Sequence, residues 1–359
     1  MASHLSRTVT STPTNIPRRR FLAAGAVLAG TALLPGRKFA SAAGPGVHPY
    51  AAAQPTDNGK RLWPLYAYAG RIYSGYGDYG ANTGPMHIMS ADPTTLEWTD
   101  HHVLESEAIA QFRSFSDGLY VPSVDPRGLL GDDYATNASG SWASIKGINP
   151  THAYDMAERV PGELWITGSQ GVDAVAWKRV NGTWEEAWRK PPPADLNVAP
   201  WGYTRSYFII SLAGSIYLQA FPGPAWPGTE PSDRWDGTSW SAGPDLNLGY
   251  VWNPTPWNGG VLLYQGGNGA PGGPLGFFNG RSIRWSDHTC SDYAITQSGV
   301  FALEAGGVVT NTTDLKKWAK VAQGPTTAVG LAVMGNTAFF GTSDSTIVTA
   351  PITIGRRRP

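Results

Sequence analysis

The chain has 359 residues, of which 11% are aromatic, including fifteen Trp, and only 15% are charged. Its 44 glycines and 29 prolines make up about a fifth of the residues and show no collagen period. This composition is typical of a turn-rich all-β protein and excludes a helical bundle or a disordered chain.

The N-terminus has the features of a targeting segment. The run Pro17–Leu22, PRRRFL, resembles the R-R-x-F-L core of a twin-arginine signal, and an Ala/Gly/Leu-rich stretch follows to Leu34. Ala40-Ser41-Ala42 then offers an A-x-A cleavage site. The resemblance implies a bacterial protein exported already folded, either secreted or kept in the cell envelope. We expect residues 1–42 to be removed, and the alternative is a short membrane anchor. No later apolar run predicts a membrane span.

Removal of residues 1–42 leaves an acidic body. That segment carries six basic residues and no acidic ones, so the 27 basic and 27 acidic residues become 21 and 27, a net charge of −6. Three of the remaining arginines lie in a basic C-terminal tail, residues 355–359. An acidic body disfavours nucleic acid as a partner. Cys290 is the only cysteine, so no intrachain disulfide forms.

The stretch GYGDYG, Gly75–Gly80, has the G-x-G-x-x-G spacing of a dinucleotide-binding turn. Such a turn needs a helix after its third glycine, because the helix N-terminus receives the pyrophosphate. Asn82, Gly84 and Pro85 interrupt any helix there. We therefore expect a loop between two strands and no nucleotide site.

One short pattern recurs along the chain, a polar or Gly turn followed by an apolar strand rich in Tyr, Trp and Phe. It is marked by Gly70, Gly118, Gly162, Gly214, Gly260, Gly299 and Gly335, at intervals of 36 to 52 residues. A second pattern alternates with it, a tight polar turn that leads into Trp98, Trp142, Trp184, Trp240, Trp285 or Trp318. Such turns between apolar runs indicate hairpins, and the interval is that of propeller blades.

Each repeat thus predicts four short antiparallel strands. The expected fold is all-β, a single β-propeller over residues 43–354 with seven four-stranded blades; six or eight blades are the alternatives. We expect the C-terminal STIVTAPI, residues 345–352, to pair with a strand within residues 47–60 and so to close the ring. Most of the repeat tryptophans should pack between blades.

The turns resemble those of Asp-box and kelch-like propellers. NTTDLKKW, residues 311–318, is similar to the Asp-box S-x-D-x-G-x-x-W of sialidase-like propellers, with Thr312 and Asp314 in place and Leu-Lys where the motif has x-Gly. WDGTSW and VNGTW are similar to the Asn/Asp-Gly turns of both groups. The resemblance implies architecture only. The F/Y-R-I-P motif of sialidases is not recognisable, since FRSFSD at 112–117 shares only Phe-Arg.

The long segments all fall in the blade-to-blade links and in the loops between second and third strands, which share one face of a propeller. Binding sites are usually built on such loops. The links should bring together, beside a central funnel, Arg113, His152, Tyr154, Asp155, Tyr203, Arg205, Tyr250, Trp252 and Tyr293. The loops should rim the funnel with Asp78, Asn82, Asp125, Asp132 and Asp133. Aromatic platforms with few charges suit a sugar, so we expect a glycan or another cell-surface ligand.

Two kinds of enzyme also fit these residues. In a polysaccharide lyase, His152 or Tyr154 would take the proton α to a uronate carboxylate that Arg113 or Arg205 neutralises. In a glycoside hydrolase, two of the loop or link carboxylates would flank the scissile bond. His152 could equally be a structural histidine. Asp132 and Asp133 could be a solvated turn, and Asp78 and Asn82 could cap their own loop.

No metal signature appears, because the chain has no H-E-x-x-H and no Cys pair. No cofactor is expected. The alternative is a structural calcium held by loop carboxylates and carbonyls, for which the sequence shows no EF-hand spacing. A further alternative is a protein-interaction platform of the cell envelope that uses the Trp/Pro-rich 221–257 region. We expect a monomer.

Overall fold

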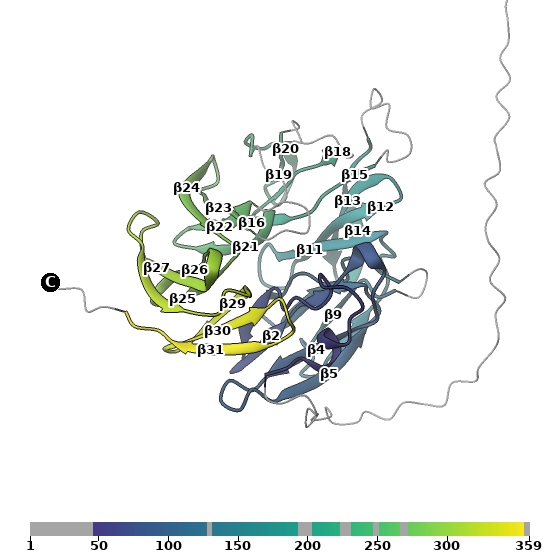
Figure 1. Ribbon diagram of the computed structural model, residues 1–359. Coiled ribbons are helices and arrows are strands. Elements are labelled where there is room, and N and C mark those ends of the chain that lie inside the picture. The colour runs from purple at the N-terminus through teal and green to yellow at the C-terminus, as the bar shows by residue number, and fades with distance from the viewer. Residues whose placement is uncertain are drawn as a thin grey trace, which may run out of the picture. The chain divides into compact units, whose positions relative to one another are not determined.

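The computed structural model describes residues 46–127, 131–192, 203–222, 231–246, 251–265 and 272–354, apart from the side chains of Pro222 and Trp252. The twin-arginine segment and the basic tail lie outside these residues. The described chain forms antiparallel sheets that follow one another in sequence order around a common centre, as Figure 1 shows. It is a seven-bladed β-propeller, as predicted.

Six blades contain four strands in the described residues. Their strands, from the innermost outward, are β1 (Leu65–Tyr68), β2 (Arg71–Ser74), β4 (Met86–Ala91) and β5 (Trp98–Leu104); β7 (Arg113–Ser114), β8 (Leu119–Pro122), β9 (Tyr134–Thr136) and β10 (Ala143–Ile145); β11 (His152–Glu158), β12 (Leu164–Gln170), β13 (Asp173–Val180) and β14 (Thr183–Lys190); β16 (Ile209–Leu212), β17 (Ser215–Leu218), β19 (Asp233–Trp235) and β20 (Trp240–Ala242); β21 (Val251–Trp257), β22 (Gly260–Gln265), β23 (Gly273–Phe278) and β24 (Ile283–Cys290); and β25 (Asp292–Thr296), β26 (Gly299–Leu303), β27 (Val308–Thr312) and β28 (Ala319–Gln323).

The seventh blade has three strands in the part of the chain that the structure describes, β29 (Ala328–Met334), β30 (Thr337–Thr342) and β31 (Ile347–Pro351). Two short pairs lie outside the blades, β3 (Tyr76–Gly77) with β6 (Ala108–Ile109) and β15 (Thr204–Arg205) with β18 (Phe221–Pro222). The helical elements of the described residues are α1 (Pro49–Ala52) and the 3-10 turns η1 (Tyr79–Ala81) and η3 (Ala305–Gly307).

The predicted turns lie where the two sequence patterns placed them. The Asn181-Gly182 and Asn258-Gly259 pairs both have positive φ at each residue (51° and 83°, 45° and 75°), the geometry that a two-residue hairpin requires. The outer hairpins share a second device, in which an Asp or Asn side chain accepts hydrogen bonds from the backbone N–H groups two and three residues later. It recurs at Asp92, Asp236, Asn279 and Asp314. These residues stabilise their turns without help from the rest of the fold.

The GYGDYG stretch forms the loop between β2 and β4, as expected. Its glycines pass through β3 and η1, and within the described residues no α-helix follows Gly80. A Cβ at Gly75 would lie 2.3 Å from the Ile109 carbonyl oxygen, and one at Gly77 would lie 2.7 Å from Ala108 Cα. These glycines therefore allow the β3–β6 backbones to approach, which is a structural role.

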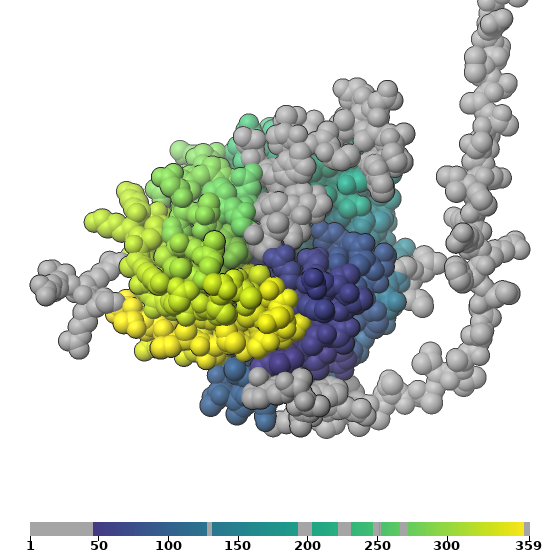
Figure 2. All heavy atoms as spheres, viewed as in Figure 1, coloured from purple at the N-terminus to yellow at the C-terminus, as the bar shows by residue number. Residues whose placement is uncertain are grey.

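The prediction that a strand within residues 47–60 closes the ring is wrong. The blade of β29–β31 does lie beside the blade of β1, so the yellow and purple ends of the fold meet in Figures 1 and 2. However, residues 49–52 form α1, and the N-terminal segment meets the C-terminal one through a single bridge, Val47 to Thr346. The Leu62 N–H also donates to the Thr342 carbonyl at 3.0 Å.

The hydrophobic core is divided among the interfaces between blades. One cluster joins Trp165 and Trp188 of the third blade to Ile216 and Leu218 of the fourth, and a similar cluster lies between other neighbouring blades. Several repeat tryptophans belong to these clusters; Trp98 is only 1% exposed. This packing makes the blades a rigid support for the loops.

Candidate functional site

An aromatic stack lies at the start of β11, on the face of the blade-to-blade links. His152 is paired with Ser169, near the end of β12, so it sits at the edge from which β11 enters the fold. The His152 and Tyr154 rings lie 5.2 Å apart and nearly parallel, at 6°. The two rings share a face, as their spacing of two residues predicted, although the register of β11 shifts between Ala153 and Asp155. The Tyr207 ring lies beside this pair, 4.8 Å from the Tyr154 ring and tilted against it by 48°.

Arg205 lies against this stack. It comes from β15, in the link between the third and fourth blades, where the Thr204 N–H donates to the Val172 carbonyl at 2.6 Å. The Arg205 guanidinium carbon lies 4.1 Å from the Tyr203 ring centre and 5.9 Å from that of Tyr154. A guanidinium over tyrosine faces is held by cation–π attraction. The structure therefore brings together four predicted site residues, His152, Tyr154, Tyr203 and Arg205.

His152 is a neutral imidazole at physiological pH. Burial, and then the positive charge of Arg205, lowers its pKa to about 3. Its Nδ1 lies 2.8 Å from Ser169 Oγ, and its Nε2 lies 3.7 Å from Asp125 Oδ1. Because the imidazole is uncharged, the second contact is not an ion pair. A structural role for His152 therefore accounts for the hydrogen bond at Nδ1. It does not account for Nε2, which is directed toward Asp125.

Asp125 has a carboxyl group that titrates near neutrality. Burial, and then the negative charge of Glu107, raises its pKa to about 7, although Arg205 opposes the shift. Glu107 comes from the link between the first two blades, and its N–H donates to the Asp125 carbonyl at 3.0 Å. Burial also raises the pKa of Glu107, against the effect of Arg127. Two carboxyl groups and an imidazole with shifted pKa values are typical of a functional site.

Sequence reasoning missed Glu107. The link ESEAIAQFR was recognised as long, but nothing local distinguishes Glu107 from Glu105. Only the fold buries Glu107, which is 8% exposed, with Oε2 unpaired among the described residues.

Arg113 and Asp155 form a plug across the centre. The Arg113 guanidinium binds both Asp155 oxygens, at 2.7 and 2.8 Å, and also Gln111 Oε1, Asn253 Oδ1 and the Pro254 carbonyl. These bonds use all five N–H groups of the guanidinium. Arg113 is 7% exposed and Asp155 is fully buried, so neither has a group left for a ligand.

The other predicted carboxylates hold backbone. Asp132 accepts from the Glu105 N–H, and Asp133 accepts from Ile148 and Asn149; both are at most 3% exposed. Asp78 caps η1 by accepting from the Gly80 N–H, and Asn82 ends that turn in the left-handed region. Asp78 also accepts from the Thr56 hydroxyl. These residues stabilise their loops, as the alternative reading of the sequence held for Asp78 and Asn82.

Three predicted residues remain. Tyr250 lies outside the described residues, and Trp252 is described only as backbone of β21, opposite Tyr264. Tyr293 is 3% exposed, and its hydroxyl shares its one hydrogen between the carbonyls of Leu262 and Asn253. Part of the proposed 221–257 interaction surface also lies outside the described residues.

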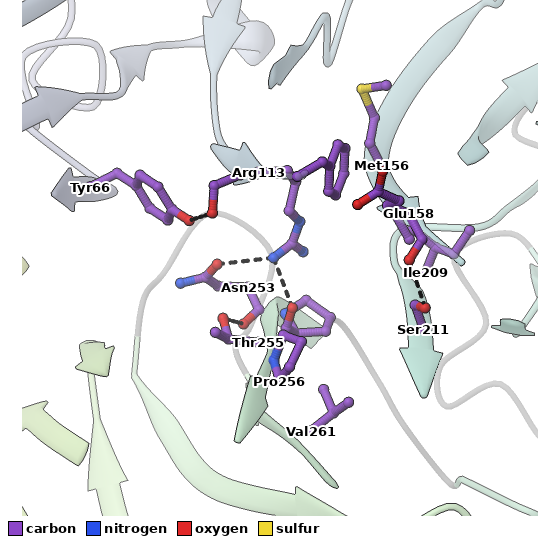
Figure 3. A pocket seen from close by; sticks show the side chains of 14 residues that line it. Tyr66, Arg113, Met156, Glu158, Ile209, Ser211, Asn253, Thr255, Pro256 and Val261 are labelled. Atoms are coloured by element: carbon purple, nitrogen blue, oxygen red, sulfur yellow. Dashed lines mark hydrogen bonds between the residues drawn. The ribbon is translucent and has the colours of Figure 1, made fainter. Parts of the chain in front are cut away.

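A central cavity of about 230 Å³ lies beyond the plug (Figure 3). It adjoins a space of about 120 Å³, with which it shares Tyr66, Asn253 and Thr255. The two are lined by residues of all seven innermost strands, β1, β7, β11, β16, β21, β25 and β29. Their lining residues Ala67, Ser114 and Pro256 are exposed and lie toward the ends of these strands, so the cavity opens on the tight-turn face.

Among the described residues there is no cluster of three or more His, Cys, Asp or Glu side chains that would hold a metal ion. In the same part of the chain, no helix is long and apolar enough to span a bilayer.

The chain is similar to several solved structures, and the first of those described here agrees with its fold. The crystal structure of virginiamycin B lyase from Staphylococcus aureus superposes with a TM-score of 0.54 at 11% identity, covering 84% of this chain and 97% of that one. YCF48 from Cyanidioschyzon merolae has a TM-score of 0.47 at 14% identity (82% and 96% covered). BamB from Moraxella catarrhalis has 0.42 at 12% (80% and 81%). No family model and no curated protein sequence matches the chain. At these identities the chain is similar to the lyase in its propeller fold alone.

Proposed function

We propose that the chain is an exported β-propeller that binds a glycan on its link face. The observation that carries the proposal is the stacked pair of His152 and Tyr154, with the tilted Tyr207 ring and Arg205 beside it. Aromatic faces pack on the C–H faces of pyranose rings, while the guanidinium and the Asp125 carboxyl bond to hydroxyls. The twin-arginine resemblance of residues 17–22 supports export, and the rigid propeller supports a preformed site.

Binding is tested with residues 43–359 in affinity gels that contain neutral or uronate polysaccharides. Tyr154→Ala and Tyr203→Ala should each weaken retardation by the bound polymer and raise its Kd by about tenfold or more, since each removes an aromatic platform. Tyr68→Ala, at the opposite end of an innermost strand, is the matched control. Retardation that all three variants retain equally would overturn the proposed site.

A lyase is the second candidate, because His152 is neutral and Arg205 lies close enough to lower its pKa. In this reaction His152 or Tyr154 would take the proton α to a uronate carboxylate, Arg205 would neutralise that carboxylate, and β-elimination would release the leaving sugar. Arg113 has no part in it, since its five N–H groups are engaged.

The same polymers distinguish the two candidates. New reducing ends together with the ultraviolet absorbance of an unsaturated uronate, both abolished by His152→Ala, would make the protein a lyase. Retardation without either signal would leave a binding protein. Neither retardation nor product on any polymer of the panel would overturn both.

A further inference from the structure

The central cavity on the tight-turn face has the features of a second binding site, independent of the link face. The Arg113–Asp155 plug separates the cavity from the aromatic stack, and neither His152 nor Tyr154 lines the cavity. Its main part, of about 230 Å³, is smaller than the pockets of drug-sized ligands and has room for about seven or eight waters. The occupant is therefore a single small molecule.

The floor of the cavity excludes an anionic ligand. Arg113 is the guanidinium that Figure 3 shows at its centre, and Asp155 neutralises it through two hydrogen bonds. The remaining N–H groups donate to Gln111, Asn253 and Pro254. A carboxylate or phosphate in the cavity would thus find a cation without a free donor.

Asn253 has a side chain whose orientation is determined by Arg113. Because the guanidinium only donates, it must face Asn253 Oδ1, at 3.1 Å, and the NH₂ group is directed away from it. That NH₂ group bonds to no described residue. Asn253 also has a φ of 50°, a left-handed conformation that Asn tolerates better than most residues. The fold thus holds an amide donor at the cavity wall.

The hydroxyls of the wall add acceptors. Thr255 donates to the Asn253 carbonyl at 2.9 Å and also contacts the Tyr293 hydroxyl. Ser211 donates to the Glu158 carbonyl at 2.9 Å, and its oxygen accepts from no described residue. Tyr66 and Ser114 bond to each other at 2.7 Å, which leaves one hydroxyl hydrogen between them. A ligand with several hydroxyl groups matches this mixture of donors and acceptors.

Glu158 supplies an uncompensated charge. Its carboxylate accepts from the Ser116 hydroxyl, the Ser116 N–H and the Gly162 N–H, all neutral donors. Within the described ranges no Lys, Arg or His forms an ion pair with it. A buried or half-buried carboxylate favours a cationic partner.

We infer that this cavity binds a small hydroxylated amine of monosaccharide size, with its ammonium group beside Glu158 and its hydroxyls on Asn253, Thr255 and Ser211. An amino sugar is the ligand class that combines these groups. The inference does not rest on the proposed glycan site, because the two sites use different residues on opposite faces.

The test is calorimetric titration of residues 43–359 with glucosamine, N-acetylglucosamine, glucose and glucuronate. Glucosamine should bind at least about tenfold more tightly than the other three, since only its ammonium group can form a charge-assisted hydrogen bond with Glu158. Glu158→Gln should weaken glucosamine binding by about tenfold or more. Glu97→Gln, which changes an exposed carboxylate in the β4–β5 turn, should leave it unchanged.

A second variant protects the result against a folding defect. Ser114→Phe places a bulky ring at the exposed mouth and should abolish binding while circular dichroism and polymer retardation stay normal. No binding of glucosamine, equal binding of glucuronate, or binding that survives both Glu158→Gln and Ser114→Phe would each overturn the inference.

Discussion

The Arg113–Asp155 plug provides a prediction whose size follows from the structure. Arg113→Met removes the cation and keeps most of the side-chain volume. Asp155 is then left fully buried with only the Met156 and Ile209 N–H groups as donors. Gln111 Oε1, Asn253 Oδ1 and the Pro254 carbonyl lose the donor that binds them from Arg113.

The expected loss is about 3–5 kcal/mol of unfolding free energy, the cost of leaving one member of a buried ion pair without the other. Domains of this kind have about 5–15 kcal/mol in total, so the variant should be close to its unfolding threshold. Adding Asp155→Asn removes the uncompensated charge and keeps an oxygen acceptor, so about 1–3 kcal/mol should return. Arg113→Lys should also destabilise, because an ammonium group cannot make the bidentate pair or supply five donors.

Urea unfolding of the wild type, both single variants and the double variant, followed by tryptophan fluorescence, measures these values. Equal slopes against urea would show that the comparison is valid. A loss below about 1 kcal/mol for Arg113→Met would refute the reasoning, since it would mean that the plug does not stabilise the ring.

Three other predictions concern the link face. The pKa of Asp125 is about 7 in the folded protein and about 4 in the unfolded chain, so the folded protein keeps a proton that the unfolded chain loses. The free energy of unfolding should therefore fall as pH rises from about 4 to 7. Urea unfolding at pH 5 and 7.5 should show a smaller fall for Asp125→Asn than for the wild type. The pKa of His152 is about 3 in the folded protein and about 6.5 in the unfolded chain, so its contribution to stability is lost as pH falls below about 6.5. Nuclear magnetic resonance should find its imidazole neutral at pH 5, and a titration midpoint near 6.5 would contradict this. A Cβ at Gly168 would lie 1.8 Å from the His152 carbonyl oxygen, so Gly168→Ala should lower the free energy of unfolding in urea by about 1–3 kcal/mol or more. Gly80→Ala, whose Cβ would meet nothing closer than 3.3 Å, should not lower it.

The sequence by itself determined the architecture because the signals of a propeller are local. An Asn-Gly pair such as Asn258-Gly259 specifies a tight hairpin, and a side chain such as Asp314 stabilises its own turn. The spacing of these turns predicted the blades, and the two-residue period of β11 predicted that His152 and Tyr154 share a face.

Only the tertiary structure decided what each polar link residue does. Arg113 was predicted to neutralise a ligand, yet its partners Asp155 and Asn253 lie 42 and 140 residues away in sequence. Glu107 acquired its shifted pKa from burial that no local pattern reveals. The first strands of all seven blades meet at the centre of a propeller, so whether a charge there binds a ligand or another strand depends on what the other six supply.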